Sequence, residues 1–498
     1  MYTLNKLTHH NSNPKFIEIF NSFSLKEQKN FIKFASSTYF NKKRNHKPLL
    51  NRLLKLNKEF LNEPESDISI SLQDELKINK RALWNRLSEL TKIAESYLLI
   101  VNTQNKTLLR NNILLEEYSK RKLSEILRLQ LTPAKIAVKN EKIEVDTYFE
   151  VHSVFQKISA YFSEQNNYFD SAVYYKLQSE YWLLHFLIVL FKQLLDTELQ
   201  KKNNIDISSE LSNELLECID KEKLLSVVKK KLPVVSIPAE IYYLLYWAFK
   251  EPDGSEFYFS ARDMFLKNSV MFAADYKNDV YQYLRNYCID KTNKGEFSYY
   301  KEIFELNNSI ISEGLFKDLN VVNSQTNNFR NFIFAALRLN EYEWIENFIH
   351  VHSRELPDDI RDDEVNLNTG ILKVYEKDFV NALNFLKKVR RKRYLQYLDT
   401  SVYKLIIFYE IADLENSYAE TARLKDYIRK HKDIPTYLKT GYQKFIKIYE
   451  NLLKIRQKNE RTESEYFVTQ LEPIKNVGLG SWLYEKGTEL LSSAVKHH

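Results

Sequence analysis

The chain has 498 residues, of which 44% are hydrophobic and 28% charged, a composition typical of globular and not of disordered proteins. Its 8 glycines and 10 prolines fall far below the roughly 35 and 25 of average usage, which argues against many tight turns, a many-stranded fold and glycine-rich phosphate loops. The formal net charge of +7 is uneven, because residues 1–110 carry a net +9 and the remainder −2.

Residues 1–105 are expected to form a small basic helical head. Ser24 and Glu27 have the spacing of a capping box, and the helix that they open can bury Phe31 and Ala35 on one face. Asn79 is expected to cap a longer helix. The apolar stripe of that longer helix is predicted at Leu83, Leu87, Leu90, Ala94 and Leu98.

Residues 106–325 alternate apolar helical patterns with polar breaks, which predicts irregular helical hairpins, including a single helix at 111–130. Residues 326–456 show a repeat. Tyr342 and Phe379 occupy equivalent places 37 residues apart, as do Ile345 and Ala382, and this spacing resembles the tetratricopeptide repeat (TPR). The consensus glycine of the first helix is not found. Residues 457–498 are expected to form a C-terminal cap or tail that begins with a loop at 459–464.

These elements predict an all-α protein, an α-solenoid of stacked TPR-like helix hairpins with a small helical head. Five short segments also look familiar: 23–27 (FSLKE), 38–42 (TYFNK), 168–172 (YFDSA), 335–339 (AALRL) and 343–349 (EWIENFI). In this order the chain resembles an uncharacterised family of large bacterial all-helical proteins with TPR-like C-terminal repeats. The resemblance covers most of the chain and implies its fold, and it supplies no activity and no catalytic residues.

No motif in the chain indicates an enzyme. Phosphate-binding glycine loops, a nucleophile elbow and a His-Glu-x-x-His zinc motif are missing from the sequence. Cys218 and Cys288 lack zinc spacing, and two cysteines in so long a chain indicate a reducing compartment. The acidic stretch 358–364 lacks the ordered spacing of a calcium or magnesium loop, and we interpret it as a solvated loop between repeats. No catalytic, cofactor or metal residues are therefore predicted.

Two basic segments are candidates for binding nucleic acid or an acidic partner. One lies in the head, where 71–97 has helix-turn-helix spacing and Arg and Asn could read base edges. The other is 387–393, with six cations in seven residues. Solvated or packing surfaces are the alternative for both, because Trp84 adjoins the first and helix-end cations are stabilised by the macrodipole at the second. The candidates are Lys42, Lys43, Arg44, Lys47, Lys80, Arg81, Asn85, Arg86, Arg390, Arg391, Lys392 and Arg393.

The expected function is that of a non-enzymatic scaffold or adaptor that binds protein partners through its helical-repeat surface, as part of a larger assembly. The alternative is a nucleic-acid-associated regulator that uses the basic head. The longest apolar run, 181–191, is shorter than the ~20 residues of a membrane span, and no secretory signal is seen, so a cytoplasmic protein is expected.

Overall fold

The computed structural model is helical throughout the part of the chain that it describes, so the all-α prediction is confirmed there. No strand occurs in these residues, although Ile143 and Phe272 form an isolated β-bridge. Among the described helices, none is long and apolar enough to cross a membrane. The described residues are 15–40, 44–59, 72–73, 77–202, 205, 214, 216, 218–317, 322–390, 393–458, 461–475 and 479–496.

Contacts divide the chain into two compact units, and each is described separately below. The first comprises Met1–Glu141 and Asp146–His185, and the second Lys142–Val145 and Phe186–His498. The finer domain boundaries expected at 105, 325 and 456 stay predictions.

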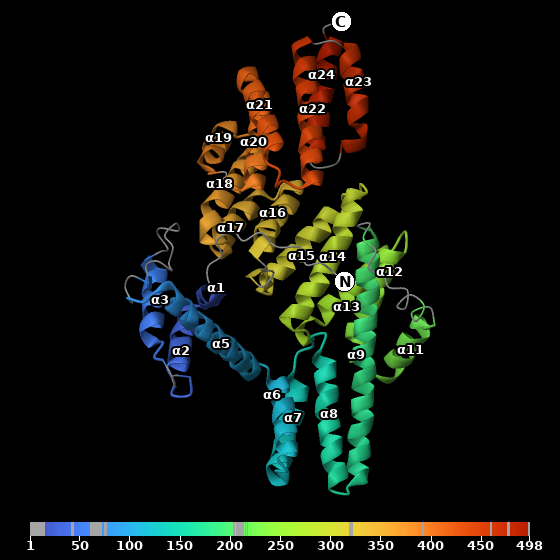
Figure 1. Cartoon of the computed structure of the whole chain (residues 1–498). Coiled ribbons are helices and arrows are strands. Elements are labelled where there is room, and N and C mark those ends of the chain that lie inside the picture. The colour runs from blue at the N-terminus through green and yellow to red at the C-terminus, as the bar shows by residue number, and fades with distance from the viewer. Residues whose placement is uncertain are drawn as a thin grey trace. The chain divides into compact units, whose positions relative to one another are not determined.

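The first unit contains the head and a second group of helices (Figure 1). The head helices are α1 (Lys15–Ser22), α2 (Leu25–Ala35), α3 (Lys47–Glu59) and α5 (Lys80–Asn105). The second group comprises α6 (Thr107–Lys120), α7 (Ser124–Asn140), α8 (Thr147–Glu164) and α9 (Tyr168–Lys202). The residues of α9 up to His185 belong to this unit. Helix α6 packs against both α7 and α8.

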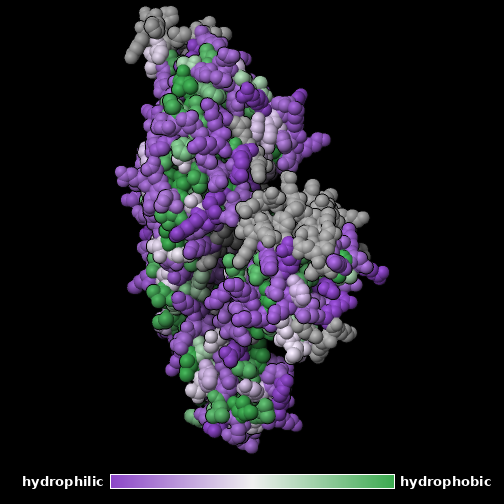
Figure 2. Space-filling view, turned by 90° about the vertical axis from the view of Figure 1, so that its left-hand side faces the viewer, coloured by the Kyte–Doolittle hydropathy of each residue, from purple (hydrophilic) through white to green (hydrophobic). Residues whose placement is uncertain are grey.

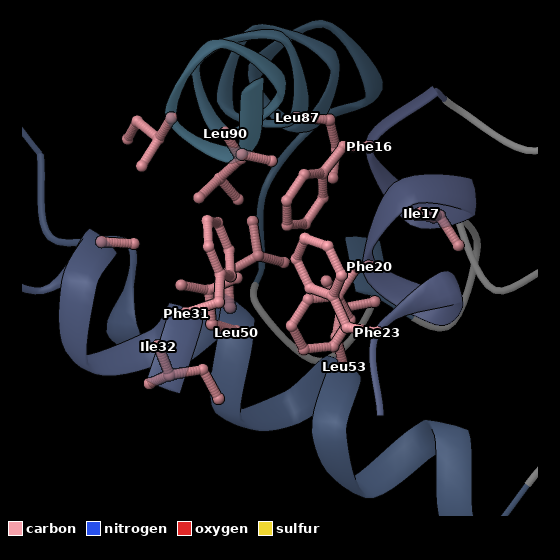
Figure 3. Packing of buried hydrophobic residues seen from close by; sticks show 14 of the residues in the cluster. Phe16, Ile17, Phe20, Phe23, Phe31, Ile32, Leu50, Leu53, Leu87 and Leu90 are labelled. Atoms are coloured by element: carbon pink, nitrogen blue, oxygen red, sulfur yellow. The ribbon is translucent and has the colours of Figure 1, made fainter. Parts of the chain in front are cut away.

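Aromatic packing holds the head together (Figure 3). Phe31 on α2 has its ring centre 5.9 Å from that of Phe16 and 5.7 Å from that of Phe23, while Tyr97 on α5 lies 5.5 Å away. Leucines of α3 and α5 complete the cluster, as Leu50 does in Figure 3. Rings at these separations add attraction to the burial of their apolar area. The head is therefore a packed core of its own.

The local signals predicted for the head are largely confirmed. Ser24 and Glu27 form both hydrogen bonds of the capping box. The side chain of Asn79 accepts a hydrogen bond from the amide of Ala82 and caps α5. The predicted stripe is wrong at its end, because Leu98 is 44% exposed. Tyr97 is buried there instead. Neighbouring residues of a helix point about 100° apart, and near the end of the stripe it is Tyr97 and not Leu98 that points towards the core.

The second unit consists mainly of helices packed in neighbouring pairs, which Figure 1 shows side by side from α14 to α21. Its first helices are α11 (Lys221–Lys231), α12 (Ile237–Lys250), α13 (Ser255–Lys267), α14 (Ala274–Asn293) and α15 (Tyr299–Ser312). These are followed by α16 (Val322–Arg338), α17 (Tyr342–His352), α18 (Asp358–Tyr375), α19 (Phe379–Lys388), α20 (Tyr394–Glu410) and α21 (Leu414–Lys430). The chain continues with α22 (Thr436–Lys458), α23 (Arg461–Leu471) and α24 (Gly480–Lys496).

Three successive pairs, α16–α17, α18–α19 and α20–α21, share one turn geometry. Asn340, Lys377 and Ala412 each adopt a left-handed backbone conformation, with φ of 59°, 63° and 59°, and the second helix begins two residues later each time. The amide after each of these residues donates to a carbonyl five residues back, at 2.8–3.0 Å. This pattern is the Schellman motif, which ends a helix by satisfying its last carbonyls.

The positions that the sequence predicts to be equivalent occupy matching places in two of these pairs, α16–α17 and α18–α19. Tyr342 and Phe379 are each the first residue of the second helix, and Ile345 and Ala382 are fully buried. The expectation that the first helices lack a contact glycine is wrong for α18. A Cβ atom on Gly370 would lie 2.8 Å from Leu386 of α19, so a glycine does allow these two helices to approach closely.

Three element predictions are wrong. The helix expected at 111–130 is interrupted because Lys122 turns left-handed, with φ of 56°, and separates α6 from α7. The acidic stretch 358–364 is helical from its first residue and opens α18. The loop expected at 459–464 has already become helix α23 at Arg461.

Candidate binding surfaces

The basic residues of the head gather near the start of α5. Lys80, Arg81 and Asn85 are exposed on its first two turns, while Arg86 is half-buried. Lys42 and Lys43 lie outside the described residues. Neither Lys80 nor Arg81 forms an ion pair within the described part of the chain. The start of α5 therefore presents cations to solvent, beside helical amides that also attract anions.

A second group of charges lies further along α5, around a buried histidine. Arg44 pairs with Glu89 at 3.2 Å, and His46 Nε2 lies 3.4 Å from the other oxygen of Glu89. Burial lowers the pKa of His46, the Glu89 carboxylate opposes this, and the positive charges of Arg86 and Arg44 lower it further. Arg44 and Arg86 are therefore brought together. The neighbouring Lys47 is exposed.

Trp84 does not pack as the sequence suggested. It is 47% exposed, one residue before Asn85 on the same exposed stretch of α5. An aromatic face beside unpaired cations is an arrangement that can stack on a base while lysine and arginine contact phosphate. This exposure removes the packing argument against a binding surface at the start of α5.

The second basic segment is neutralised in part by the acidic stretch 358–364. Arg390 donates to Asp363 through its Nε at 3.1 Å and through its backbone amide at 3.0 Å. The side-chain bond and the charge of Asp363 raise the pKa of Arg390. Arg393 lies 3.5 Å from Asp359. Arg391 and Lys392 lie outside the described residues. Two of the four candidate cations here are thus bound to carboxylates of the same unit.

A buried ionic network links the first helices of successive pairs. Arg330 on α16 donates two hydrogen bonds of 2.7 Å to Glu364 on α18 and one of 2.9 Å to Asp399 on α20. Tyr442 on α22 donates to Asp399 at 2.6 Å. Burial raises the pKa of Asp399, while Arg330 and Tyr442 act in the opposite direction. Glu364 is fully buried, so the network fixes the register of α16, α18, α20 and α22.

A recess of about 240 Å³ opens beside the ends of the same first helices. It lies where α16, α18 and α20 end, and the start of α24 closes one side. Aromatic, aliphatic and charged side chains line it together. The lining residues are Arg338, Val374, Tyr375, Lys377, Phe379, Tyr403, Ile406, Glu410, Leu479, Ser481, Trp482, Glu485 and Lys486.

Helix α24 is anchored at the recess by Trp482. Its indole nitrogen donates to Glu410 at 2.8 Å, and its ring centre lies 5.4 Å from that of Tyr409. Lys486 lies 3.2 Å from Glu410 and from Glu485, and it also pairs with Glu489 outside the recess. Burial opposes the charge on Lys486, but the surrounding carboxylates hold its pKa above the ordinary value. The wall made by α20 and α24 is therefore preassembled.

The surface also exposes single apolar side chains. In the first unit, Tyr168, Tyr175 and Trp182 lie exposed at seven-residue intervals on α9, and Leu129 and Ile136 are exposed on α7. On the face shown in Figure 2, hydrophobic residues form small groups within a mostly hydrophilic surface. These groups do not single out one docking face.

Sequence reasoning missed the recess, since its lining residues come from four separate stretches between 338 and 486. Trp482 lies in the predicted C-terminal cap or tail, but its sequence context does not indicate what it contacts. Models of known protein families give no match to the chain, and no curated protein is significantly similar to it. The resemblance to a bacterial helical family therefore stays a prediction.

Proposed function

We propose that the protein is a non-enzymatic scaffold that binds a protein partner across the first helices of a TPR-like array, within a larger assembly. The observation that carries this proposal is the recess, because three successive first helices, α16, α18 and α20, line it jointly. Helical-repeat proteins bind on surfaces to which each repeat contributes in the same way. The equivalent places of Tyr342 and Phe379 at the start of α17 and α19, and of the buried Ile345 and Ala382, support the treatment of these pairs as repeats.

The proposal is tested by capturing partners from the native lysate with a matched pair of charge-reversal variants. Lys377 lines the recess, whereas Lys432 is an exposed lysine in the connection between α21 and α22. A partner that uses the recess should be lost with Lys377→Glu and retained with Lys432→Glu. Nuclease treatment in parallel removes captures bridged by nucleic acid. Equal capture by both variants would exclude this surface as the partner site.

Nucleic-acid binding by the head is the second candidate. It is favoured by the exposure of Lys80, Arg81 and Asn85 beside the half-exposed Trp84. The first turns of a helix supply amides and a positive dipole end for phosphate, and an exposed indole can stack on an unpaired base. Single-stranded nucleic acid fits this combination better than duplex.

The test is fluorescence anisotropy with labelled single-stranded DNA and RNA over a series of salt concentrations. Lys80→Glu with Arg81→Glu should weaken binding and make the salt dependence shallower by roughly two log units per log unit of salt. Lys29→Glu with Lys33→Glu, two exposed cations on α2, make the same change of charge elsewhere in the head. Equal losses in both double variants would indicate attraction by net charge alone.

A further inference from the structure

The recess at the ends of α16, α18 and α20 has charge of opposite sign on its two walls. Arg338 and Lys377 stand on the wall formed by α16 and the turn after α18. On the wall formed by α20 and α24, Glu410 and Glu485 share Lys486, so two carboxylates outnumber one cation there. The recess is thus positive on one side and negative on the other.

Arg338 is held in a fixed orientation on the positive wall. Its guanidinium lies 4.9 Å from the ring centre of Phe334 and donates to the hydroxyl of Ser481 at 3.4 Å. A guanidinium has five N–H donors in a planar fork, enough to hold Ser481 and a carboxylate at the same time. Burial raises the pKa of Tyr375 and Tyr403 beside it, so both phenols stay protonated, and the two hydroxyls are hydrogen-bonded to each other.

The size and polarity of the recess restrict its ligand. About 240 Å³ lies below the roughly 300–1,000 Å³ of sites for drug-sized molecules, so the occupant is small. A lone anion would face the carboxylates of Glu410 and Glu485, and a lone cation would face Arg338. An apolar molecule would leave both walls without polar contacts, which is unfavourable once water is displaced.

We propose that this recess binds a small zwitterion of the amino-acid class, with its carboxylate at Arg338 and its ammonium group near Glu410 and Glu485. Trp482, Ile406 and Val374 form apolar surface for the side chain of the ligand. The ligand would contact three first helices and α24 at once. This site does not require a protein partner, so it stands independently of the scaffold proposal.

The experiment measures binding of the twenty free amino acids and a set of dipeptides to the full-length protein, by thermal shift and then by calorimetry. Each amino acid that binds is then compared with three derivatives. The N-acetyl derivative lacks the ammonium charge, the amide lacks the carboxylate charge, and the doubly blocked form lacks both. We expect the parent to bind at least tenfold more tightly than either singly charged derivative. Dipeptides keep both charges at a larger separation, and tighter binding of these would identify a chain segment as the natural ligand.

Variants on both walls assign the binding to the recess. Arg338→Gln should weaken binding at least tenfold, whereas Arg429→Gln, an exposed arginine on α21, should leave it unchanged. Because Arg338 also contacts Phe334 and Ser481, its variant is checked by circular dichroism. Glu485→Gln, at an exposed position of the opposite wall, should reduce the preference for the parent over the N-acetyl derivative.

The proposal is overturned if no member of the panel binds below about 10 mM, equivalent to a very weak site. It is equally overturned if blocked derivatives bind as well as the parents, or if folded Arg338→Gln retains full affinity. The scaffold proposal is tested by partner capture with Lys377→Glu and not by these binding measurements. A negative result here therefore does not exclude it.

Discussion

Two basic segments look alike in the sequence and differ in the structure. At the end of α19, Arg390 and Arg393 are bound by Asp363 and Asp359 from the start of α18. At the start of α5, Lys80 and Arg81 are exposed and form no ion pair with the described residues. Similar runs of cations thus differ in how far carboxylates of the same unit neutralise them.

The comparison also shows why the acidic stretch 358–364 was misinterpreted. In the sequence alone it looked like a solvated loop. In the structure its carboxylates lie on different faces of α18 and pair with different cations. Asp359 and Asp363 face the basic segment after α19, while Glu364 faces Arg330. Acidic residues in the first turn also favour the helix start through its dipole. The opposite charges of two segments thus stabilise one helix pair.

Arg330 should show the largest effect when it is removed, because it pairs with both Glu364 and Asp399. Arg330→Met leaves the fully buried Glu364 without its bidentate partner, which is expected to cost about 3–5 kcal/mol. Urea denaturation followed by circular dichroism measures the loss. Arg81→Met, at an exposed site, should change the free energy of unfolding by less than about 0.5 kcal/mol.

A small effect of Arg330→Met would contradict the expectation that a cation bound to a buried carboxylate contributes far more to the free energy of unfolding than an exposed cation such as Arg81. Glu364→Gln combined with Arg330→Met tests this further. The double variant leaves no unpaired charge at the pair, so it should be more stable than Arg330→Met alone.

Local signals made much of the fold predictable. The capping box of Ser24 and Glu27 and the cap at Asn79 depend on residues within one turn of each other, and both are present. The left-handed turns at Lys122 and Lys377 were not predictable. Glycine is the usual signal for that conformation, and a lysine adopts it only where the packing of two helices compensates the strain.

Removing the carboxylates that pair with the second basic segment should strengthen its attraction for polyanions. Asp359→Asn with Asp363→Asn removes the partners of Arg390 and Arg393, so the variant should elute from heparin at higher salt than the parent. Glu341→Gln with Glu343→Gln makes the same change of net charge at exposed carboxylates of the same unit. If both variants shift equally, net charge explains the result and the contrast between the segments fails.

The candidate site was predictable only where its residues are close in sequence. Lys80, Arg81 and Asn85 were found because one helix carries all three. The recess brings Arg338 and Ser481 to 3.4 Å across 143 residues, and Arg390 reaches Asp363 across 27. Hydropathy and charge patterns describe which residues share a face, but they do not specify which distant helix packs against that face.

The smallest expected effect concerns the pH dependence of the head. Burial is the main cause that lowers the pKa of His46, so the folded head favours the neutral imidazole. As pH falls below the ordinary histidine value of about 6.5, the unfolded chain takes up the proton first, and the free energy of unfolding decreases. The contribution of neutral His46 to the free energy of unfolding is therefore fully present above this pH, and it is lost as the pH falls towards the lowered pKa.

His46→Gln removes the titrating group and should lose less stability than the parent between pH 7.5 and pH 5.5. Urea denaturation at several pH values measures the difference, with His431→Gln, a partly exposed histidine in the second unit, as the control. A steeper loss in His46→Gln than in the parent would mean that Glu89 outweighs burial and stabilises the charged imidazole. The charged imidazole would then share the Glu89 carboxylate with Arg44, which already pairs with it.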